Sequence, residues 1–589
     1  MCKYSIVFLL SFLSLSTFAG NIKYNLKMPR PQNHYYHVEM ELEGFKEKEL
    51  KVKMPVWAPG SYLVREFARN VDLVKAFDEN NNAIEVTKCD KNTWKISKGK
   101  AKKITVKYEV YAFELSVRTS FLDDTHGFVS GSGVFMYVEG HKNQSGSLQV
   151  YPYTTFGTIT TALEKGDSEN SFVFNNYDQL VDCPLEIGNQ IQFSFNSAGT
   201  EHNVAIYGKG NFDVDQLKID MAKITQAATN VFGQNPNKKY TFIIHNVVDG
   251  QGGLEHTNST VLSVNRWTFA GSKYIGFLSL VAHEYFHLWN VKRIRPIELG
   301  PFDYDKENYT SLLWVMEGFT SYYDELLLLR AGYYTKEEFL NKLFGTINYV
   351  EGTPGTRVQP VAHASFDAWI KAYRPDENSR NSTMSYYSKG TIIAALLDAM
   401  IIEKYDGKKC LDHFMQRVYS EYYEKKGRGF SENEFKKELE LFLGRNLDEF
   451  YAKYINGVEI PNYNDFFSKI GLNVNYSGKT EASVGMFITE NNGKTIVRGI
   501  VSNSAAEDAG ISVNDEIIGC NGMRADKSSL EDYFKGVQEG ELIEILFARD
   551  QELFSTEIKV TSKEIPRFEM KFNDDKSTHE KFNYWLRAE

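Results

Sequence analysis

Cysteine is scarce in this chain. Its 589 residues include five cysteines, and the four that follow the N-terminal segment are far apart and show no paired spacing: Cys89, Cys183, Cys410 and Cys520. This distribution argues against a disulfide scaffold and against a cysteine-ligated zinc site, even in an oxidising compartment. We expect most of these thiols to be buried packing residues.

The chain also lacks net positive charge and long apolar runs. Its formal net charge is -10, which disfavours binding to nucleic-acid phosphates as the main function. Beyond the N-terminus no run of about 20 apolar residues occurs. The closest, residues 392–402, is short and contains Asp398. We therefore expect no nucleic-acid partner and no transmembrane segment in the mature chain.

The first 19 residues form a segment of a different kind. Lys3 precedes an apolar stretch at residues 6–15, and small residues follow at 17–19. This pattern is typical of a secretory signal peptide, and the apolar stretch is too short to cross a bilayer comfortably. We predict an exported protein, periplasmic or secreted, with an uncleaved anchor as the alternative.

The chain is too long for one hydrophobic core, so several domains are expected. Residues 20–200 alternate between apolar and polar positions, as where Tyr36, Val38 and Met40 interleave with His37 and Glu39. A period of two with turn residues between the segments predicts an N-terminal β-sandwich domain.

The pattern changes after residue 200 and predicts a multidomain α+β protein. A helical apolar face at 213–231 and a buried strand at 240–248 are followed by helices at about 273–291, 310–330, 390–404 and 431–443. The last helix starts with the capping box formed by Ser431 and Glu434. These features place a mixed α/β domain at 201–475, a β-rich domain at 476–563 and a charged tail at 564–589.

The strongest chemical signal is a pair of histidines within an apolar helix. His283 and His287 are separated by about 40° around the helix axis, so both imidazoles can reach one metal ion. Glu284 follows the first histidine, where it can take a proton from a metal-bound water. The alternative is two core histidines satisfied by hydrogen bonds, but burying this set without a partner would be costly.

Zinc requires a third protein ligand and one open position. Glu317 is our candidate, because a carboxylate within the apolar stretch 312–320 is hard to explain without a cation. A salt bridge to an arginine is the alternative for Glu317. The competing acids occupy more polar stretches that suit a solvated face better: Glu298, Glu307 and Glu325.

These motifs resemble a known family. His283-x-x-x-His287 followed by Trp314-x-x-Glu317-Gly318 is similar to the gluzincin metallopeptidases, whose third zinc ligand is such a glutamate. More closely, the chain resembles the M61 glycyl aminopeptidases over nearly its whole mature length, with support from the stretches 54–62, 287–293 and 365–369. The resemblance implies a thermolysin-like zinc peptidase domain with one Zn2+ per chain, held by His283, His287 and Glu317.

The resemblance implies further site residues. Gly252-Gly253-Leu254-Glu255-His256 is similar to an edge-strand motif in which the glutamate holds the α-ammonium of the substrate. A carboxylate on a Gly-flanked edge strand can pair with that charge, although a turn with an exposed acid is the alternative. We assign Glu255 and Gly253 to substrate binding. His256 would orient Glu255 or line the pocket.

A tyrosine is implied as the donor to the developing oxyanion. Tyr386-Tyr387-Ser388-Lys389-Gly390 is similar to the aminopeptidase segment that carries this residue, and Tyr387 is the matching position. Tyrosine suits the role because its phenol stays protonated at neutral pH. Tyr386 is the alternative.

The β-rich unit at 476–563 resembles a PDZ domain. Gly485-Met486-Phe487-Ile488 is similar to the loop whose backbone amides bind a peptide carboxylate, so a peptide or protein partner is one prediction. Packing against the peptidase domain, or a role in assembly, is the other.

The sequence therefore predicts a zinc aminopeptidase whose partners are peptides with a free N-terminus. In this interpretation Glu284 is the general base and Tyr387 stabilises the oxyanion. The resemblance implies a preference for small N-terminal residues such as Gly or Ala. The alternatives are a zinc endopeptidase and a non-catalytic exported protein that binds peptides or acts as a chaperone.

Overall fold

A computed structural model describes residues 20–250, 252–573 and 575–587. The predicted signal peptide at 1–19 lies outside the described residues. Within the described ranges, no helix is both long and apolar enough to cross a bilayer. The chain divides into two units, one formed by residues 20–56, 66–115 and 119–189 and the other by residues 57–65, 116–118 and 190–587.

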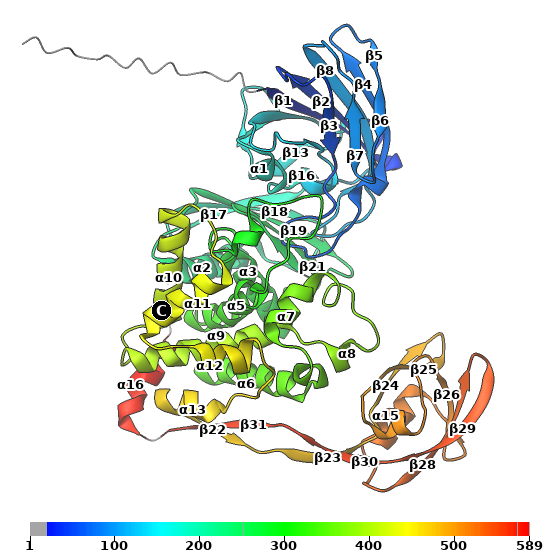
Figure 1. The fold of residues 1–589 in the computed structure, drawn as a ribbon, viewed down its shortest axis with the longest axis vertical. Coiled ribbons are helices and arrows are strands. Elements are labelled where there is room, and N and C mark those ends of the chain that lie inside the picture. The colour runs from blue at the N-terminus through cyan, green and yellow to red at the C-terminus, as the bar shows by residue number, and fades with distance from the viewer. Residues whose placement is uncertain (1–19, 251, 574, 588–589) are drawn as a thin grey trace, which may run out of the picture. The chain divides into compact units, whose positions relative to one another are not determined.

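The first unit is built from β-sheets (Figure 1). The eight strands of the largest sheet are, in spatial order, β14 (Glu164–Lys165), β15 (Ser171–Phe174), β12 (Gly146–Tyr151), β1 (Asn21–Lys27), β2 (Tyr35–Glu43), β8 (Lys103–Tyr111), β4 (Val71–Asp78) and β5 (Ala83–Ile84). A four-stranded sheet contains β13 (Thr158–Thr161), β16 (Leu185–Gly188), β10 (Gly127–Val129) and β9 (Phe121–Leu122). Another contains β11 (Tyr137–Val138), β3 (Leu50–Lys53), β7 (Thr93–Ile96) and β6 (Val86–Lys88).

Period-two alternation explains these strands. In β2 the apolar residues Tyr36, Val38 and Met40 are fully buried, while the polar residues between them are half-buried. One face of each such strand therefore enters the core and the other faces water. The predicted N-terminal β-sandwich is confirmed as a set of sandwich-like sheets.

The predicted boundary at residue 200 differs from the structure. Strand β17 (Ile191–Ser197), which we assigned to the first domain, pairs in antiparallel fashion with β18 (Thr200–Tyr207) in the second unit. Alternation identifies a strand but does not identify its partner, so the first unit ends at Asn189.

A mixed five-stranded sheet opens the second unit. Its spatial order is β17, β18, β19 (Lys239–Val247), β21 (Ser259–Asn265) and β20 (Gly253–Glu255). Strands β18, β19 and β21 are parallel, and β20 runs antiparallel to β21 at the edge. The sheet thus presents an edge strand made of the Gly-rich motif.

Helix α2 lies between β18 and β19 in the chain, and the other helices follow the sheet; helices occur in all four regions where long helices were predicted. The helices of this region are α2 (Val214–Phe232), α3 (Gly271–Phe286), α4 (Leu313–Met316), α5 (Gly318–Arg330), α6 (Lys336–Gly352), α7 (Val361–Phe366), α8 (Ser379–Ser382), α9 (Tyr386–Lys404), α10 (Leu411–Val418), α11 (Glu432–Leu443), α12 (Asp448–Phe450) and α13 (Tyr463–Phe467). The predicted helix at 310–330 is interrupted at Glu317, which ends α4 and precedes α5. The capping box of Ser431 and Glu434 is present at the start of α11.

The β-rich region near the C-terminus has its own hydrophobic core, in which Val497, Ile543 and Ile558 are fully buried. Its sheet contains β24 (Met486–Asn491), β25 (Lys494–Ile500), β26 (Glu516–Cys520), β28 (Leu542–Arg549) and β29 (Glu552–Lys559), with β27 (Met523–Arg524) paired to β26. Its helices are α14 (Ala505–Asp508) and α15 (Lys527–Phe534), and α15 contacts β24.

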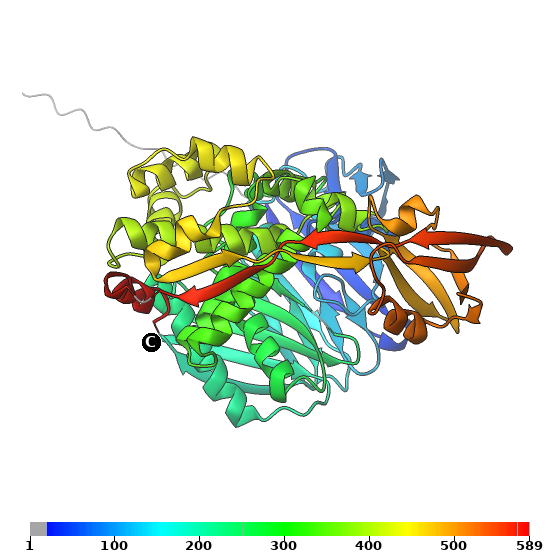
Figure 2. The same ribbon diagram turned by 90° about the horizontal axis from the view of Figure 1, so that it is seen from below.

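The segment that we predicted as a charged tail forms strand and helix within its described residues. Strand β30 (Thr561–Ile565) pairs with β23 (Lys479–Ser483), and β31 (Phe568–Phe572) pairs with β22 (Leu472–Tyr476), so outgoing and returning strands form one ribbon (Figure 2). Helix α16 (Lys576–Trp585) follows, and the Trp585 ring donates a hydrogen bond to the Tyr322 hydroxyl. The charged composition of this segment gave no indication that residues such as Trp585 are buried.

Candidate active site

The two predicted histidine ligands lie at the end of helix α3. His283 is in the last turn and His287 is the C-cap residue, with their ring centroids 4.7 Å apart. The helix is largely apolar and its C-terminal half is buried, which fixes both backbones. The one-turn spacing therefore brings the imidazoles to the same point, as predicted.

Both imidazoles are oriented by hydrogen bonds at their Nδ1 atoms. His283 Nδ1 is 2.8 Å from Asp324 Oδ2, and His287 Nδ1 is 2.7 Å from the Asn290 carbonyl oxygen. Since each Nδ1–H has an acceptor, the neutral tautomer leaves each Nε2 lone pair available to a metal. Asn290 is itself fixed, because its side-chain amide donates to the carbonyl oxygens of Val315 and Met316.

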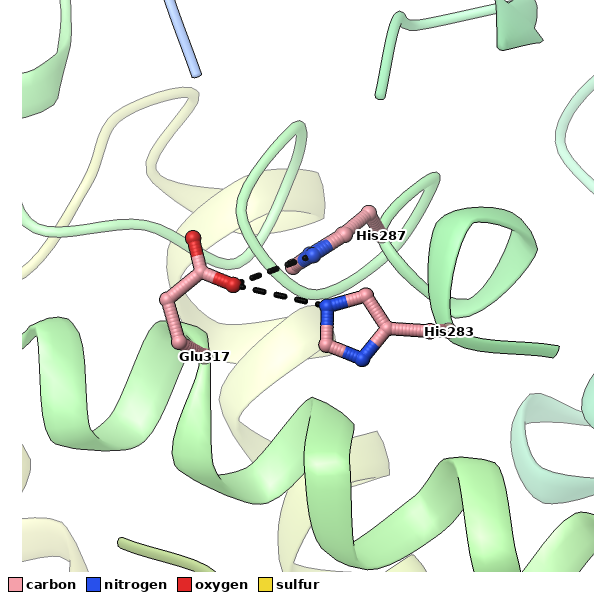
Figure 3. A group of neighbouring side chains, drawn as sticks. All are labelled: His283, His287 and Glu317. Carbon is pink, nitrogen blue, oxygen red and sulfur yellow. Dashed lines mark ion pairs between the residues drawn. The ribbon is translucent and has the colours of Figure 1, made fainter. Parts of the chain in front are cut away.

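Glu317 completes a group of three candidate metal ligands. Its Oε2 atom is 3.3 Å from His287 Nε2 and 3.6 Å from His283 Nε2 (Figure 3). Charge-assisted hydrogen bonds between nitrogen and oxygen are about 2.7–2.9 Å long. Ligand atoms about 2.0–2.1 Å from a tetrahedral zinc lie about 3.3–3.4 Å apart. The observed separations match three ligands of one ion better than a direct ion pair.

The charge state of Glu317 supports the same geometry. Burial by itself raises the pKa of this carboxyl, but the adjacent imidazoles of His287 and His283 lower it to about 2. The carboxylate is therefore ionised, as a metal ligand must be. The competing acids are not part of this group: Glu298, Glu307 and Glu325.

Glu284 lies beside the three ligands. Its side chain is buried, and burial raises the pKa of this carboxyl to about 7 against the lowering effect of the two imidazoles. Its Oε2 atom has no hydrogen-bond partner among the described residues. A Cβ atom on Gly253 would be 2.3 Å from Glu284 Oε1, so only glycine permits this packing against the edge strand.

Glu255 lies on edge strand β20 and lines the same cavity. Its carboxylate is buried, and its Oε1 atom has no hydrogen-bond partner in the described part of the chain. Gly60 packs against it with a positive φ of 88°, and a Cβ atom there would lie 2.6 Å from Glu255 Oε1. His256 is buried but is not among the residues that line this cavity.

Tyr387 lies in the first turn of α9 and faces the histidines. Its ring stacks on that of His283, with 6.3 Å between centroids. Burial and the nearby Glu317 carboxylate raise the pKa of Tyr387 well above its ordinary value, so its hydroxyl keeps the proton it would donate. Tyr386 stacks on Tyr387 at 4.8 Å and is not among the residues that line the cavity.

These residues surround one cavity of about 550 Å³. The three ligand candidates, Glu284, Glu255 and Tyr387 all line it. It is large enough for a short peptide, and its lining combines three candidate metal ligands with a carboxylate that can act as a base and a phenol that can donate a hydrogen bond.

Comparisons with known proteins agree with this architecture. Residues 23–189 match the family model of the peptidase M61 N-terminal domain, and residues 276–393 match that of M61 glycyl aminopeptidase. The chain therefore carries the N-terminal and the glycyl aminopeptidase domains of the M61 peptidase family. It is therefore a hydrolase that acts on peptide bonds.

Solved structures similar to this M61 peptidase include an aminopeptidase N family protein from Idiomarina loihiensis. It is 28% identical with a TM-score of 0.89, over 96% of this chain and all of that one. An M1 zinc metallopeptidase from Deinococcus radiodurans has a TM-score of 0.48 at 12% identity, over 75% of this chain and 94% of that one. A search of curated protein sequences gives no match.

The sequence of this M61 peptidase did not reveal three residues of the site. Asp324 orients His283, Asn290 orients His287, and Arg118 lines the cavity with its Nη2 atom 3.4 Å from the Gly253 carbonyl oxygen. Asn290 belongs to the stretch 287–293 that carried the family resemblance. Asp324 was detectable as an acid about two helical turns beyond Glu317, whereas Arg118 has no local signal.

Proposed function

We propose that this M61 peptidase is a zinc-dependent aminopeptidase that releases small N-terminal residues such as Gly or Ala from peptides. The observation that carries the proposal is the convergence of the Nε2 atoms of His283 and His287 on the Glu317 carboxylate, with Glu284 beside them.

The donor set fits zinc. Two imidazoles and one carboxylate form the ligand set of many catalytic zinc sites, in which a fourth position stays open. The ligand atoms of the three residues lie within 4.8 Å of one another, and the two Nδ1 atoms are occupied by Asp324 and Asn290. When bound, zinc supplies Lewis acidity to the scissile carbonyl and to a water molecule.

The chain's own residues perform the proton transfers. Glu284, ionised, takes a proton from the attacking water and then donates it to the leaving amine. Its Oε2 atom, which has no hydrogen-bond partner in the described ranges, is available for this exchange. Tyr387 donates a hydrogen bond to the carbonyl oxygen as negative charge develops there, which stabilises the transition state more than the ground state.

Glu255 supports an exopeptidase. Its buried carboxylate on an edge strand lines the cavity of the ligand set, where it can pair with the α-ammonium group of a bound peptide. That contact would place the first peptide bond at the metal and leave room for only one residue before it. The preference for small residues rests on family membership alone.

Two other proposals come from the sequence. The N-terminal 19 residues support export to the periplasm or beyond, and the region at 476–563 supports a PDZ-like domain with a peptide or protein partner. In favour of the latter, α15 contacts β24, and Gly485 precedes β24 with a positive φ of 76°. A groove between a strand and a helix is the usual site of strand addition in such domains.

A peptide panel tests the proposed function. We expect wild-type protein with one zinc per chain to cleave Ala-Ala-Ala amide but not its N-acetylated form, and Glu284→Gln to bind zinc normally with little turnover. Equal cleavage of free and acetylated peptides would indicate an endopeptidase. Absence of zinc, or turnover unchanged in Glu284→Gln, would favour a non-catalytic peptide-binding protein.

A further inference from the structure

A second cavity, of about 770 Å³, adjoins the first. Arg118, Tyr373 and Tyr387 line both cavities, whereas Glu255 lines only the first. The candidate oxyanion donor therefore lies at the boundary between them. A substrate held at Glu255 has a single residue before the cleaved bond, so a cavity beyond Tyr387 is available to the residues that follow the bond.

The second cavity is basic, although the chain carries a net charge of -10. No aspartate or glutamate of the described residues lines it. Its basic residues are Arg65, Arg118, Lys371, Arg380 and Arg498. A cavity lined by five basic residues and by no acidic residue of the described ranges attracts negatively charged groups from solution and repels positive ones.

Several cations of this cavity keep donors available. Within the described ranges, no carboxylate forms an ion pair with Arg118, Lys371 or Arg380. The buried Nε atom of Arg118 has no hydrogen-bond partner there either, and its Nη2 atom makes only a long contact with Gly253. Guanidinium groups bind carboxylates through paired, charge-assisted hydrogen bonds.

We propose that this basic cavity binds the part of the substrate that follows the cleaved bond and selects peptides with a carboxylate there. The proposal rests on the aminopeptidase function proposed above. The carboxylate is an Asp or Glu side chain, or the C-terminus of a short peptide. Arg118, at the junction of the two cavities, contacts the first such group, and Lys371 contributes to the positive field of the second cavity.

Five peptides with the same N-terminal residue test this proposal. They are Ala-Glu-Ala amide, Ala-Gln-Ala amide, Ala-Lys-Ala amide, Ala-Ala-Ala amide and Ala-Ala-Ala with a free C-terminus. We expect kcat/KM to be about tenfold higher for the Glu than for the Gln peptide, mainly through KM, and lowest for the Lys peptide. If kcat/KM is similarly higher for Ala-Ala-Ala with a free C-terminus than for its amide, the C-terminal carboxylate of a short peptide also binds in the cavity.

Variants of the cavity residues test which side chains produce the preference for the Glu peptide over the Gln peptide. Arg118→Gln and the double variant with Lys371→Gln should reduce the ratio between Glu and Gln peptides toward one. Arg445→Gln, which removes the same charge from an exposed position outside the cavity, should leave the ratio unchanged. Calorimetric binding of the same peptides to zinc-loaded Glu284→Gln gives an independent readout without turnover.

The outcomes separate the two proposals. If the Glu and Gln peptides are cleaved and bound equally, or if the double variant retains the full preference, the carboxylate subsite is wrong and the aminopeptidase function stands. If no peptide with a free N-terminus is cleaved, the proposed function itself is wrong.

Discussion

Gly318 and Gly390 lie against each other without side chains between them. A Cβ atom on Gly318 would be 2.3 Å from Gly390 Cα, and one on Gly390 would be 2.4 Å from the Trp314 carbonyl oxygen. This contact joins the start of α5 to the first turns of α9. Glu317 directly precedes Gly318, and Tyr387 lies one helical turn before Gly390, so the contact fixes the positions of Glu317 and Tyr387 relative to each other. Lys389 anchors the same turn through its ion pair with Glu351.

Gly318→Ala should therefore destabilise the protein. Forcing a methyl group into this backbone contact is expected to cost about 1–3 kcal/mol in the free energy of unfolding. Gly345→Ala is the matched control, because Gly345 lies on the exposed side of α6 with open space around it and should gain about 0.5–1 kcal/mol from better helix propensity. Thermal unfolding of both variants measures the difference. A neutral Gly318→Ala would contradict the close contact.

Asp324→Asn should weaken zinc binding. The amide cannot hold His283 by the charged hydrogen bond seen at 2.8 Å, and loss of such a partner typically lowers metal affinity about 10–100-fold. Glu325→Gln removes a neighbouring carboxylate that pairs with Lys342 instead, and should bind zinc like wild type. Competition with a chelator, followed by metal analysis, measures both. If Asp324→Asn retained zinc as well as wild type does, Asp324 would not support the zinc ligand His283.

Tyr387→Phe should lower kcat about 100- to 1,000-fold with little change in KM, because the hydroxyl acts on charge that develops in the transition state. Tyr386→Phe removes the adjacent hydroxyl and should retain most activity. Steady-state kinetics on Ala-Ala-Ala amide distinguish the two. The reverse result would assign the donor role to Tyr386.

Glu255→Gln should lose the discrimination in favour of a free N-terminus. The neutral amide cannot balance the α-ammonium charge, so kcat/KM for free peptides should fall about 10- to 100-fold while zinc content stays unchanged. The activity on N-acetylated peptides should stay at its low wild-type level. A variant that cleaves free peptides as well as wild type does would show that Glu255 does not hold the ammonium group.

Glu284 should set the acidic limb of the pH profile. Burial raises the pKa of this carboxyl to about 7, while the imidazoles lower it, and a bound cation adds to that lowering. Since the base must be ionised, kcat/KM should fall as pH decreases through a midpoint below about 7. Glu284→Gln should lose about 1,000-fold in activity together with this limb. An identical limb in its residual activity would require another base.

The accuracy of the sequence predictions varied with the range of the interactions involved. The spacing of His283 and His287 is local helix geometry, and Glu317 was recognisable as a carboxylate in an apolar stretch. The pairing of β17 with β18 and the burial of Trp585 in the C-terminal segment were missed, because they depend on partners that alternation and composition do not identify.

The sequence alone determined the helical positions of the metal-ligand candidates and the alternation of the first unit, since both follow from backbone periods of 3.6 and 2 residues. Only the tertiary structure decided which distant groups complete the site. Gly60 at Glu255, Asp324 at His283 and Arg118 at the junction of two cavities are long-range contacts. Their formation depends on how the elements pack, and no local pattern encodes that packing.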